Sequence, residues 1–271
     1  MWHQLTDEVN QWEGVVVVSY EGLFSVPTDV INEILDTFST SRIEILVTCR
    51  SLYELVISQW QESIKAGDTI SLKTYADEVA QGPKNTTNSS LIFWITADLA
   101  TPIKRWSQSV GIENVTVQCV DTSQPEVTLR IFEQINEIPS GLLGTGSQSS
   151  INQSMTYSEA ELIRSCNEML FEGSVSNHLY SIMTPDVRRK ILSKIPHVDD
   201  SKIELPTSYY ESIAAFVNSE VQLIVNSGAR ITGDVSLLTR IPQGFSDSRN
   251  SDINFDKDVI ETILRQSLLD S

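Results

Sequence analysis

Hydrophobic residues in the first half of the chain form short β-branched runs separated by segments with helical spacing. The runs cover Val15–Val18, ending at Ser19, Tyr20 and Glu21, then Ile43–Val47 and Val115–Val120. The unbroken run Val15–Val18 is typical of a strand buried on both faces, as in a parallel sheet. The pattern therefore predicts three parallel strands.

Between and after these runs, apolar residues recur at the spacing of amphipathic helices. The predicted helices cover 28–38, with Pro27 and Thr28 as cap and first turn, and then 52–60, 91–110 and 129–135. Alternating strands and helices favour βαβ units with right-handed crossovers. The predicted fold class is α/β, a parallel sheet with flanking helices, joined to a mainly helical C-terminal region.

Composition divides the chain into four parts. Residues 1–138 form the α/β core, 139–156 a linker rich in Gly, Ser, Gln and Asn, 157–242 a mainly helical region, and 243–271 a polar linker with a terminal amphipathic helix. Thr156 and Glu159 have the spacing of a capping box. Helices are also predicted at 185–195 and 209–225, and an extended segment at 228–238. The terminal helix either docks on the body or binds a partner helix.

The net charge of the chain is -17, with 36 acidic and 19 basic residues. Nucleic acid binding draws on clusters of Lys and Arg, so nucleic acid is excluded as an expected partner. A small anionic cofactor stays compatible with this charge, because a few basic groups can bind phosphate locally.

No apolar run reaches the ~20 residues of a membrane span. The N-terminus does not read as a secretory signal, and we expect a cytoplasmic protein.

Several kinds of chemistry have no support in the sequence. Cys49, Cys119 and Cys166 are far apart and are expected to be buried structural thiols. The three histidines are isolated, so no metal site is predicted. Neither a G-x-S-x-G elbow nor a G-x-G-x-x-G loop is present, and the glycine-rich segment 141–146 lacks the Lys of a phosphate loop.

The segment from Thr48 to Trp60 carries the strongest chemical signal. Arg50 ends a predicted buried strand, and Ser58 follows eight positions later in the next helix. Ligands of open parallel sheets gather at this edge, where an Arg fork can donate two bonds to a phosphate and a Ser hydroxyl can add another. Alternatively, Arg50 is a salt-bridged surface residue and Ser58 a small packing residue.

This segment resembles the stretch of sulfotransferases that holds the 3'-phosphate of 3'-phosphoadenosine 5'-phosphosulfate, where an Arg after a strand is followed by a Ser at the same spacing. The run Val15–Glu21 resembles the strand of bacterial sulfotransferase-family proteins that ends at the catalytic base. The resemblance covers roughly residues 2 to 135. It implies that Arg50 and Ser58 bind the cofactor and that Glu21 is the general base. Alternatively, Glu21 caps or orients the following loop.

The resemblance implies transfer of a sulfuryl group from 3'-phosphoadenosine 5'-phosphosulfate to a hydroxyl or amine of a carbohydrate or small metabolite, without a metal. The family's fold begins with a strand and a Gly- and Lys-containing phosphate loop, and this chain starts after that point. We therefore expect that the chain is a fragment of a longer protein, that its start was placed too late, or that it is a family member that has lost transfer activity. In each case, this chain alone should transfer the sulfuryl group weakly or not at all. The alternative is a non-catalytic nucleotide-binding or protein-interaction module on the same fold.

Overall fold

The computed structural model describes residues 2–38, 42–144, 154–172, 183–194, 203–242, 253 and 255–269. The chain forms two compact units, each assembled from segments that are far apart in the sequence. The first contains Met1–Leu52, Ile95–Gln148 and Phe216–Arg240, and the second contains Tyr53–Trp94, Ser149–Ala215 and Ile241–Ser271. Each unit therefore draws on both halves of the chain.

The sheet of the first unit has three parallel strands in the order β1-β2-β3. They are β1 (Ile45–Cys49), β2 (Val115–Cys119) and β3 (Arg230–Thr232). All five residues of the central strand β2 are buried, and its two polar side chains are hydrogen-bonded. Arg230 Nε donates to Thr116 Oγ1 at 3.0 Å, and Gln118 Nε2 donates to the backbone oxygen of Thr128 at 2.9 Å. The sheet confirms the predicted mixed α/β class and the strands at 43–47 and 115–120.

Strand β3 comes from the segment that the sequence placed in a separate, mainly helical region. It lies inside the predicted extended segment 228–238 and pairs with β2 through Val117 and Ile231. The sheet therefore includes residues from both sides of the predicted linker, and the four-part division of the chain stays a prediction.

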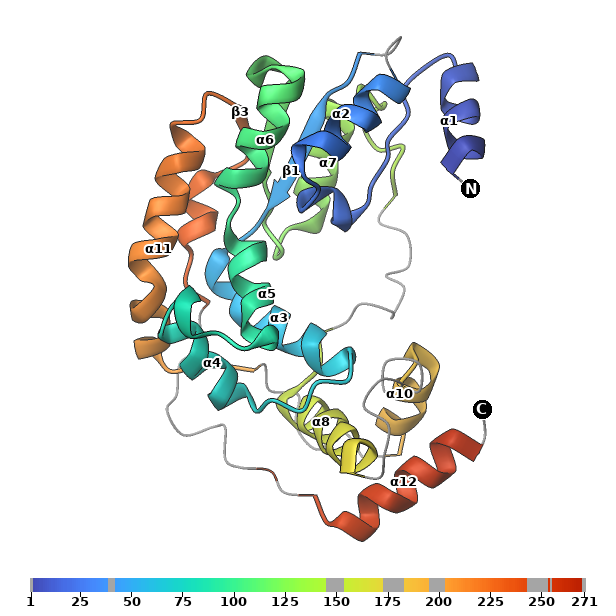
Figure 1. The fold of residues 1–271 in the computed structure, drawn as a ribbon, viewed down its shortest axis with the longest axis vertical. Helices are drawn as coiled ribbons and strands as arrows, with labels where there is room; N and C mark the ends of the chain where they lie inside the picture. The colour runs from blue at the N-terminus through green and yellow to red at the C-terminus, as the bar shows by residue number, and fades with distance from the viewer. Residues whose placement is uncertain are drawn as a thin grey trace. The chain divides into compact units, whose positions relative to one another are not determined.

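Helices lie around the sheet in the first unit (Figure 1). Their bounds are α1 (Trp2–Gln11), η1 (Glu21–Phe24), α2 (Thr28–Thr37), α6 (Ala100–Val110), η3 (Ile112–Asn114), α7 (Pro125–Ile135) and η5 (Val235–Thr239). Helix α2 packs on α6, and α6 also contacts β2. The predicted helices at 28–38 and 129–135 are confirmed as α2 and α7, and α2 buries Ile31 in this core.

Helix α6 also fixes the chain segment that leads into α2. The Arg105 guanidinium donates from Nη1 to the backbone oxygen of Val26 at 2.9 Å and from Nη2 to that of Phe24 at 3.1 Å. The Trp106 indole Nε1 donates to the backbone oxygen of Leu23 at 3.2 Å. These bonds satisfy backbone carbonyls at the end of η1 and in the short connection to α2.

The prediction of a buried strand at Val15–Val18 is wrong. The four side chains are 61%, 41%, 49% and 47% exposed, and their residues are not part of the sheet. Strand propensity reflects packing on a pleated surface, and these valines have no such surface against them in the described chain. Glu21 consequently begins the short helix η1 instead of ending a strand.

The single helix predicted at 91–110 is two helices, α5 (Asn88–Ala97) and α6. The buried Glu220 carboxylate accepts the backbone N–H groups of Leu99 at 3.2 Å and Ala100 at 3.1 Å, and Asp98 Oδ1 accepts that of Thr101 at 3.0 Å. Carboxylates that bond the first N–H groups of a helix cap it. The break therefore follows from capping, which apolar spacing does not reveal.

The second unit is built mainly from helices. They are α3 (Leu52–Lys65), α4 (Leu72–Ala80), η2 (Pro83–Asn85), α8 (Tyr157–Glu172), α10 (Pro185–Leu192), α11 (Thr207–Val225) and α12 (Lys257–Leu269), with α3, α5 and α11 each continuing into the first unit's segments. Helix α12 packs on α8 and α10, burying Ile260, Ile263 and Leu264. The terminal helix thus docks on the body through its apolar face.

The predicted capping box at the start of α8 is confirmed. The Thr156 backbone N–H donates to Glu159 Oε2 at 2.8 Å, and the Glu159 backbone N–H donates to Thr156 Oγ1 at 3.3 Å. These reciprocal bonds satisfy backbone donors at the helix start.

Parts of two predicted polar segments lie outside the described residues, namely 145–153 of the linker and 243–252 and 254 of the segment before α12. His178 and His197 also lie outside them. In the described part of the chain, no helix combines the length and apolar character needed to cross a membrane.

Candidate functional site

The carboxyl edge of the parallel sheet gathers polar residues from all three strand ends. Arg50 and Ser51 follow β1, Asp121 lies two residues after β2, and Asp234 lies two residues after β3. All of them belong to the first unit. Ligands of open parallel sheets bind outside this edge, so these residues form the first candidate site.

Hydrogen bonds connect the ends of β1 and β2 with Arg240, which follows η5. Arg240 donates from Nη2 to Asp121 Oδ1 at 3.0 Å and from Nη1 to Oδ2 at 3.3 Å. The Ser51 hydroxyl donates to the backbone oxygen of Arg240 at 2.6 Å. Ser123 donates to Asp121 Oδ1 from its backbone N–H at 2.9 Å and from its hydroxyl at 2.6 Å. Four residues of the edge therefore form one connected polar network, namely Ser51, Asp121, Ser123 and Arg240.

Hydrogen bonds favour the ionised form of both carboxylates at this edge. The bonds from Arg240, followed by those from Ser123, hold the pKa of Asp121 well below its usual range. The hydroxyl and backbone N–H of Ser236 lower the pKa of Asp234, whose side chain caps η5. One of these carboxylates, Asp121, forms an ion pair with Arg240 at 3.0 Å.

Arg50 is half-buried and directly follows the last residue of β1. Helix α3 begins two residues later at Leu52, so its first backbone N–H groups start beside the same strand end. A guanidinium and a helix N-terminus are both donors that favour an anion. This is the position that the sequence predicted for Arg50.

Ser58 lies six residues into α3, about 9 Å along the helix axis from Leu52 at ~1.5 Å per residue. Its side chain is half-buried. The structure assigns Ser58 to the second unit and Arg50 to the first, so it does not bring the two predicted cofactor residues into one unit. Their joint contact with a phosphate stays a prediction.

Glu21 belongs to the first unit, and its side chain is exposed. A general base gains from partial desolvation, and the exposed Glu21 carboxylate does not have it. Among the described residues, the alternative that Glu21 orients the following loop fits its place at the first position of η1.

The structure adds Ser51, Asp121 and Arg240 to the residues that the sequence singled out. Asp121 could have been found, because it directly follows the predicted strand 115–120. No sequence pattern marks Arg240, because it lies 119 residues from Asp121 and the two side chains come together only when the sheet forms.

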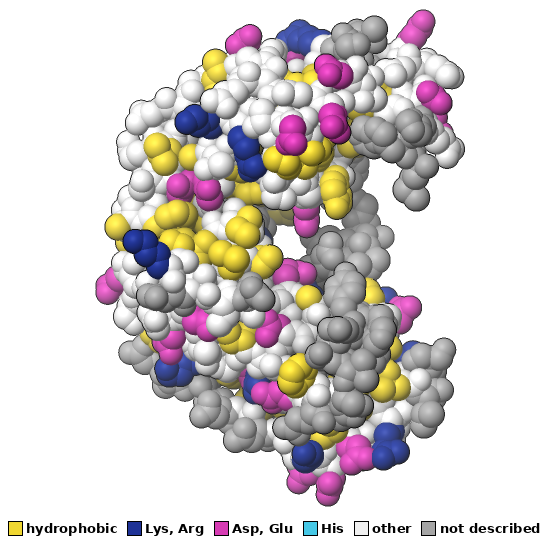
Figure 2. Space-filling model, viewed as in Figure 1, with side chains coloured by type: hydrophobic (Ala, Val, Ile, Leu, Met, Phe, Trp, Pro, Cys, Tyr) yellow, Lys and Arg dark blue, Asp and Glu magenta, His cyan; other side chains and the backbone are white. Residues whose placement is uncertain are grey.

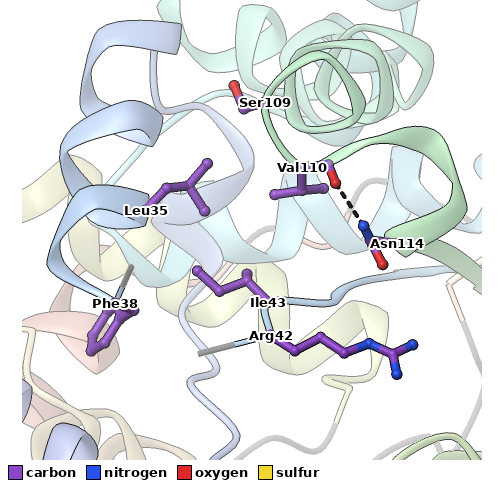
Figure 3. Close-up of a pocket in the computed structure, with 7 residues that line it drawn as sticks. All are labelled: Leu35, Phe38, Arg42, Ile43, Ser109, Val110 and Asn114. Atoms are coloured by element: carbon purple, nitrogen blue, oxygen red, sulfur yellow. Dashed lines mark hydrogen bonds between the residues drawn. The ribbon is translucent and has the colours of Figure 1, made fainter. Parts of the chain in front are cut away.

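A shallow pocket of about 300 Å³ lies elsewhere in the first unit (Figure 3). It is lined by Leu35, Phe38, Arg42, Ile43, Ser109, Val110 and Asn114. The Asn114 amide donates to the backbone oxygen of Val110 at 2.7 Å, and Arg42 forms an exposed ion pair with Glu44 at 2.6 Å. Its lining residues precede β1 and β2, so the pocket lies toward the amino end of the sheet, away from the carboxyl edge.

The described surface offers no extended basic face in the view of Figure 2, where Lys and Arg side chains are scattered among acidic ones. Within the described ranges, no group of three or more His, Cys, Asp or Glu side chains could hold a metal ion. Anion binding would therefore be local, at an individual arginine.

Comparison of the chain with protein-family models, with curated proteins and with solved structures gave no match.

Proposed function

We propose that the chain is a sulfotransferase-like protein that binds the 3'-phosphate of a phosphoadenosine nucleotide at Arg50. The observation that supports it is the position of Arg50, half-buried at the carboxyl end of β1 in an all-parallel sheet and two residues before α3. A bidentate guanidinium at this edge suits a phosphate better than it suits a neutral ligand.

The activity proposed for this site is transfer of a sulfuryl group from 3'-phosphoadenosine 5'-phosphosulfate to a hydroxyl or amine of a carbohydrate or small metabolite. The acceptor must lose a proton as the group is transferred, and Glu21 is the base that the sequence resemblance implies. Because Glu21 is exposed, nucleotide binding is the better supported part of the proposal, and binding without transfer is the alternative.

Calorimetric titration with adenosine 3',5'-bisphosphate tests the binding. We expect micromolar affinity in the unaltered chain and a loss of roughly 10- to 150-fold in Arg50→Ala, the equivalent of about 1.5 to 3 kcal/mol for a hydrogen bond to a charged group. Arg50→Lys should recover only part of the affinity, since it keeps the charge and loses the fork.

Two controls make the result specific. Arg265→Ala removes an exposed arginine of α12 that pairs with Glu261, and it should leave binding unchanged. Adenosine 5'-monophosphate, which lacks the 3'-phosphate, should bind more weakly than the bisphosphate and should be insensitive to Arg50→Ala. Absence of binding by the unaltered chain, or equal binding by Arg50→Ala, would refute the proposal.

A further inference from the structure

Two of the three cysteines are register partners at the last position of neighbouring strands. Cys49 ends β1, Cys119 ends β2, and the two residues lie opposite each other in the parallel ladder. Register partners project to the same face, and neighbouring strands are about 4.8 Å apart. Both side chains are buried, with 6% and 2% of their surfaces exposed. The sheet therefore brings together two thiols that are 70 residues apart in the sequence.

The two thiols also differ in acidity. A hydrogen bond from the Cys49 thiol lowers the pKa of Cys119, and the same interaction raises the pKa of Cys49. The backbone oxygen of Gln118 lies 3.5 Å from Cys49 Sγ and is a second acceptor for the same thiol proton. Cys119 is consequently the sulfur that ionises first, and Cys49 stays protonated beside it.

Cys166 provides the contrast within the same chain. It lies fully buried in α8, and burial raises its pKa to about 12. A thiol in that setting packs as a small hydrophobic group. The prediction of buried thiols holds for all three cysteines, but only Cys49 and Cys119 have a second sulfur within reach.

The pair lies near the accessible end of the sheet. The residues that follow the two cysteines, Arg50 and Val120, are each half-buried. Gly233 packs its backbone against the same end of β2, where a Cβ would clash with the backbone oxygen of Cys119. The sulfurs are buried behind these residues, so we expect a small oxidant to reach them and a large one to be excluded.

We propose that Cys49 and Cys119 are a redox-active dithiol that hydrogen peroxide converts to an intramolecular disulfide. The Cys119 thiolate attacks one peroxide oxygen, the O–O bond breaks, and hydroxide leaves, which forms a sulfenic acid. The Cys49 sulfur then attacks Cys119 Sγ, the S–O bond breaks, and water leaves with the thiol proton. In sum, two thiols lose two electrons and two protons, and one peroxide becomes two water molecules.

The strand spacing is compatible with this bond, because disulfides join Cα atoms about 4.4 to 6.8 Å apart. The inference does not depend on the proposed nucleotide site, since its readout is the state of the sulfurs. Failure of the nucleotide titration would leave it intact, and failure of the oxidation would leave the nucleotide site intact.

The test treats the reduced full chain with increasing hydrogen peroxide, blocks the remaining thiols with N-ethylmaleimide and maps the peptides by mass spectrometry. We expect loss of two thiols, a crosslink between the peptides of Cys49 and Cys119, one free thiol at Cys166, and reversal by dithiothreitol. In the reduced chain, iodoacetamide should modify Cys119 more than about tenfold faster than Cys166, since one unit of pKa changes the thiolate fraction about tenfold.

Single variants assign the roles of the two sulfurs. Cys49→Ser should leave Cys119 as a sulfenic acid that dimedone traps, Cys119→Ser should leave Cys49 reduced, and Cys166→Ser should behave as the unaltered chain does. Three free thiols after peroxide, oxidation of Cys119 without a crosslink, or equal oxidation of Cys166 would each overturn the proposal. If a serine variant does not fold, the crosslink map of the unaltered chain decides alone.

Discussion

Arg240 donates two hydrogen bonds to Asp121, at 3.0 and 3.3 Å, and so joins the segment after η5 to the loop after β2. The bond that Ser51 donates to the backbone of Arg240 adds the end of β1 to the same arrangement. The carboxyl edge of the sheet is therefore held by side chains from three distant segments.

Acid should remove the stability that Asp121 contributes to the fold. Its folded pKa is depressed, so the stability it contributes is present above the unfolded pKa of about 3.9 and is lost as the pH falls toward the folded value. We expect Asp121→Asn to lower the urea midpoint at pH 7, and the difference from the unaltered chain to shrink below about pH 4. Asp186→Asn, which removes an exposed ion pair with Arg189, should change little. A pH-independent difference would contradict this.

Glu220 should have the opposite pH dependence. Burial raises its pKa, although the backbone N–H groups of Ala100 and Leu99 partly oppose this. The charged form therefore costs stability above the folded pKa, and the cost disappears as the pH falls toward the unfolded value of about 4.3. In urea unfolding, we expect the free energy of unfolding of Glu220→Gln, relative to that of the unaltered chain, to be higher at pH 7 than at pH 4. Glu220→Ala removes the cap of α6 and should cost roughly 0.5 to 2 kcal/mol.

Thr156→Ala should remove one half of the capping box of α8. The Glu159 N–H would lose the hydroxyl oxygen that it bonds at 3.3 Å. We expect a loss of about 1 kcal/mol in the free energy of unfolding, measured with urea. Thr156→Ser keeps the hydroxyl and should stay close to the unaltered chain. Equal losses in both variants would show that the methyl group, and not the cap, stabilises this position.

Trp60 should contribute a hydrogen bond as well as volume. Its ring is fully buried in α3, and its indole Nε1 donates to the backbone oxygen of Ile70 at 2.9 Å. Trp60→Phe leaves that carbonyl unpaired and should cost about 1 to 3 kcal/mol, while Trp60→Ala should cost about 3 to 5 kcal/mol. Trp12→Phe at an exposed position should stay within about 0.5 kcal/mol. Thermal or urea unfolding measures all three.

Local patterns in the sequence predicted most of the elements correctly. The runs at 43–47 and 115–120 are strands, and the helical spacing at 28–38 and 129–135 marks α2 and α7. The capping box at Thr156 and Glu159 needs only residues three apart, and it is present. These features depend on the backbone period and on near neighbours, which a sequence displays directly.

Burial and long-range contacts were not predictable in the same way. Val15–Val18 has a stronger β-branched pattern than β1, yet it lies exposed, and the three-residue β3 completes the sheet instead. The break between α5 and α6 depends on Glu220, which is more than a hundred residues away. Strand pairing and capping of this kind depend on which segments meet in space.

The sequence by itself therefore determined the mixed α/β class, the position of Arg50 after a strand and the caps made by neighbouring residues. Only the tertiary structure decided that Arg240 meets Asp121, that Cys49 meets Cys119, and that Glu21 stays exposed. The physical reason is that propensity and periodicity act within a few residues. Register, burial and charge pairing arise when distant segments compete for the same surface.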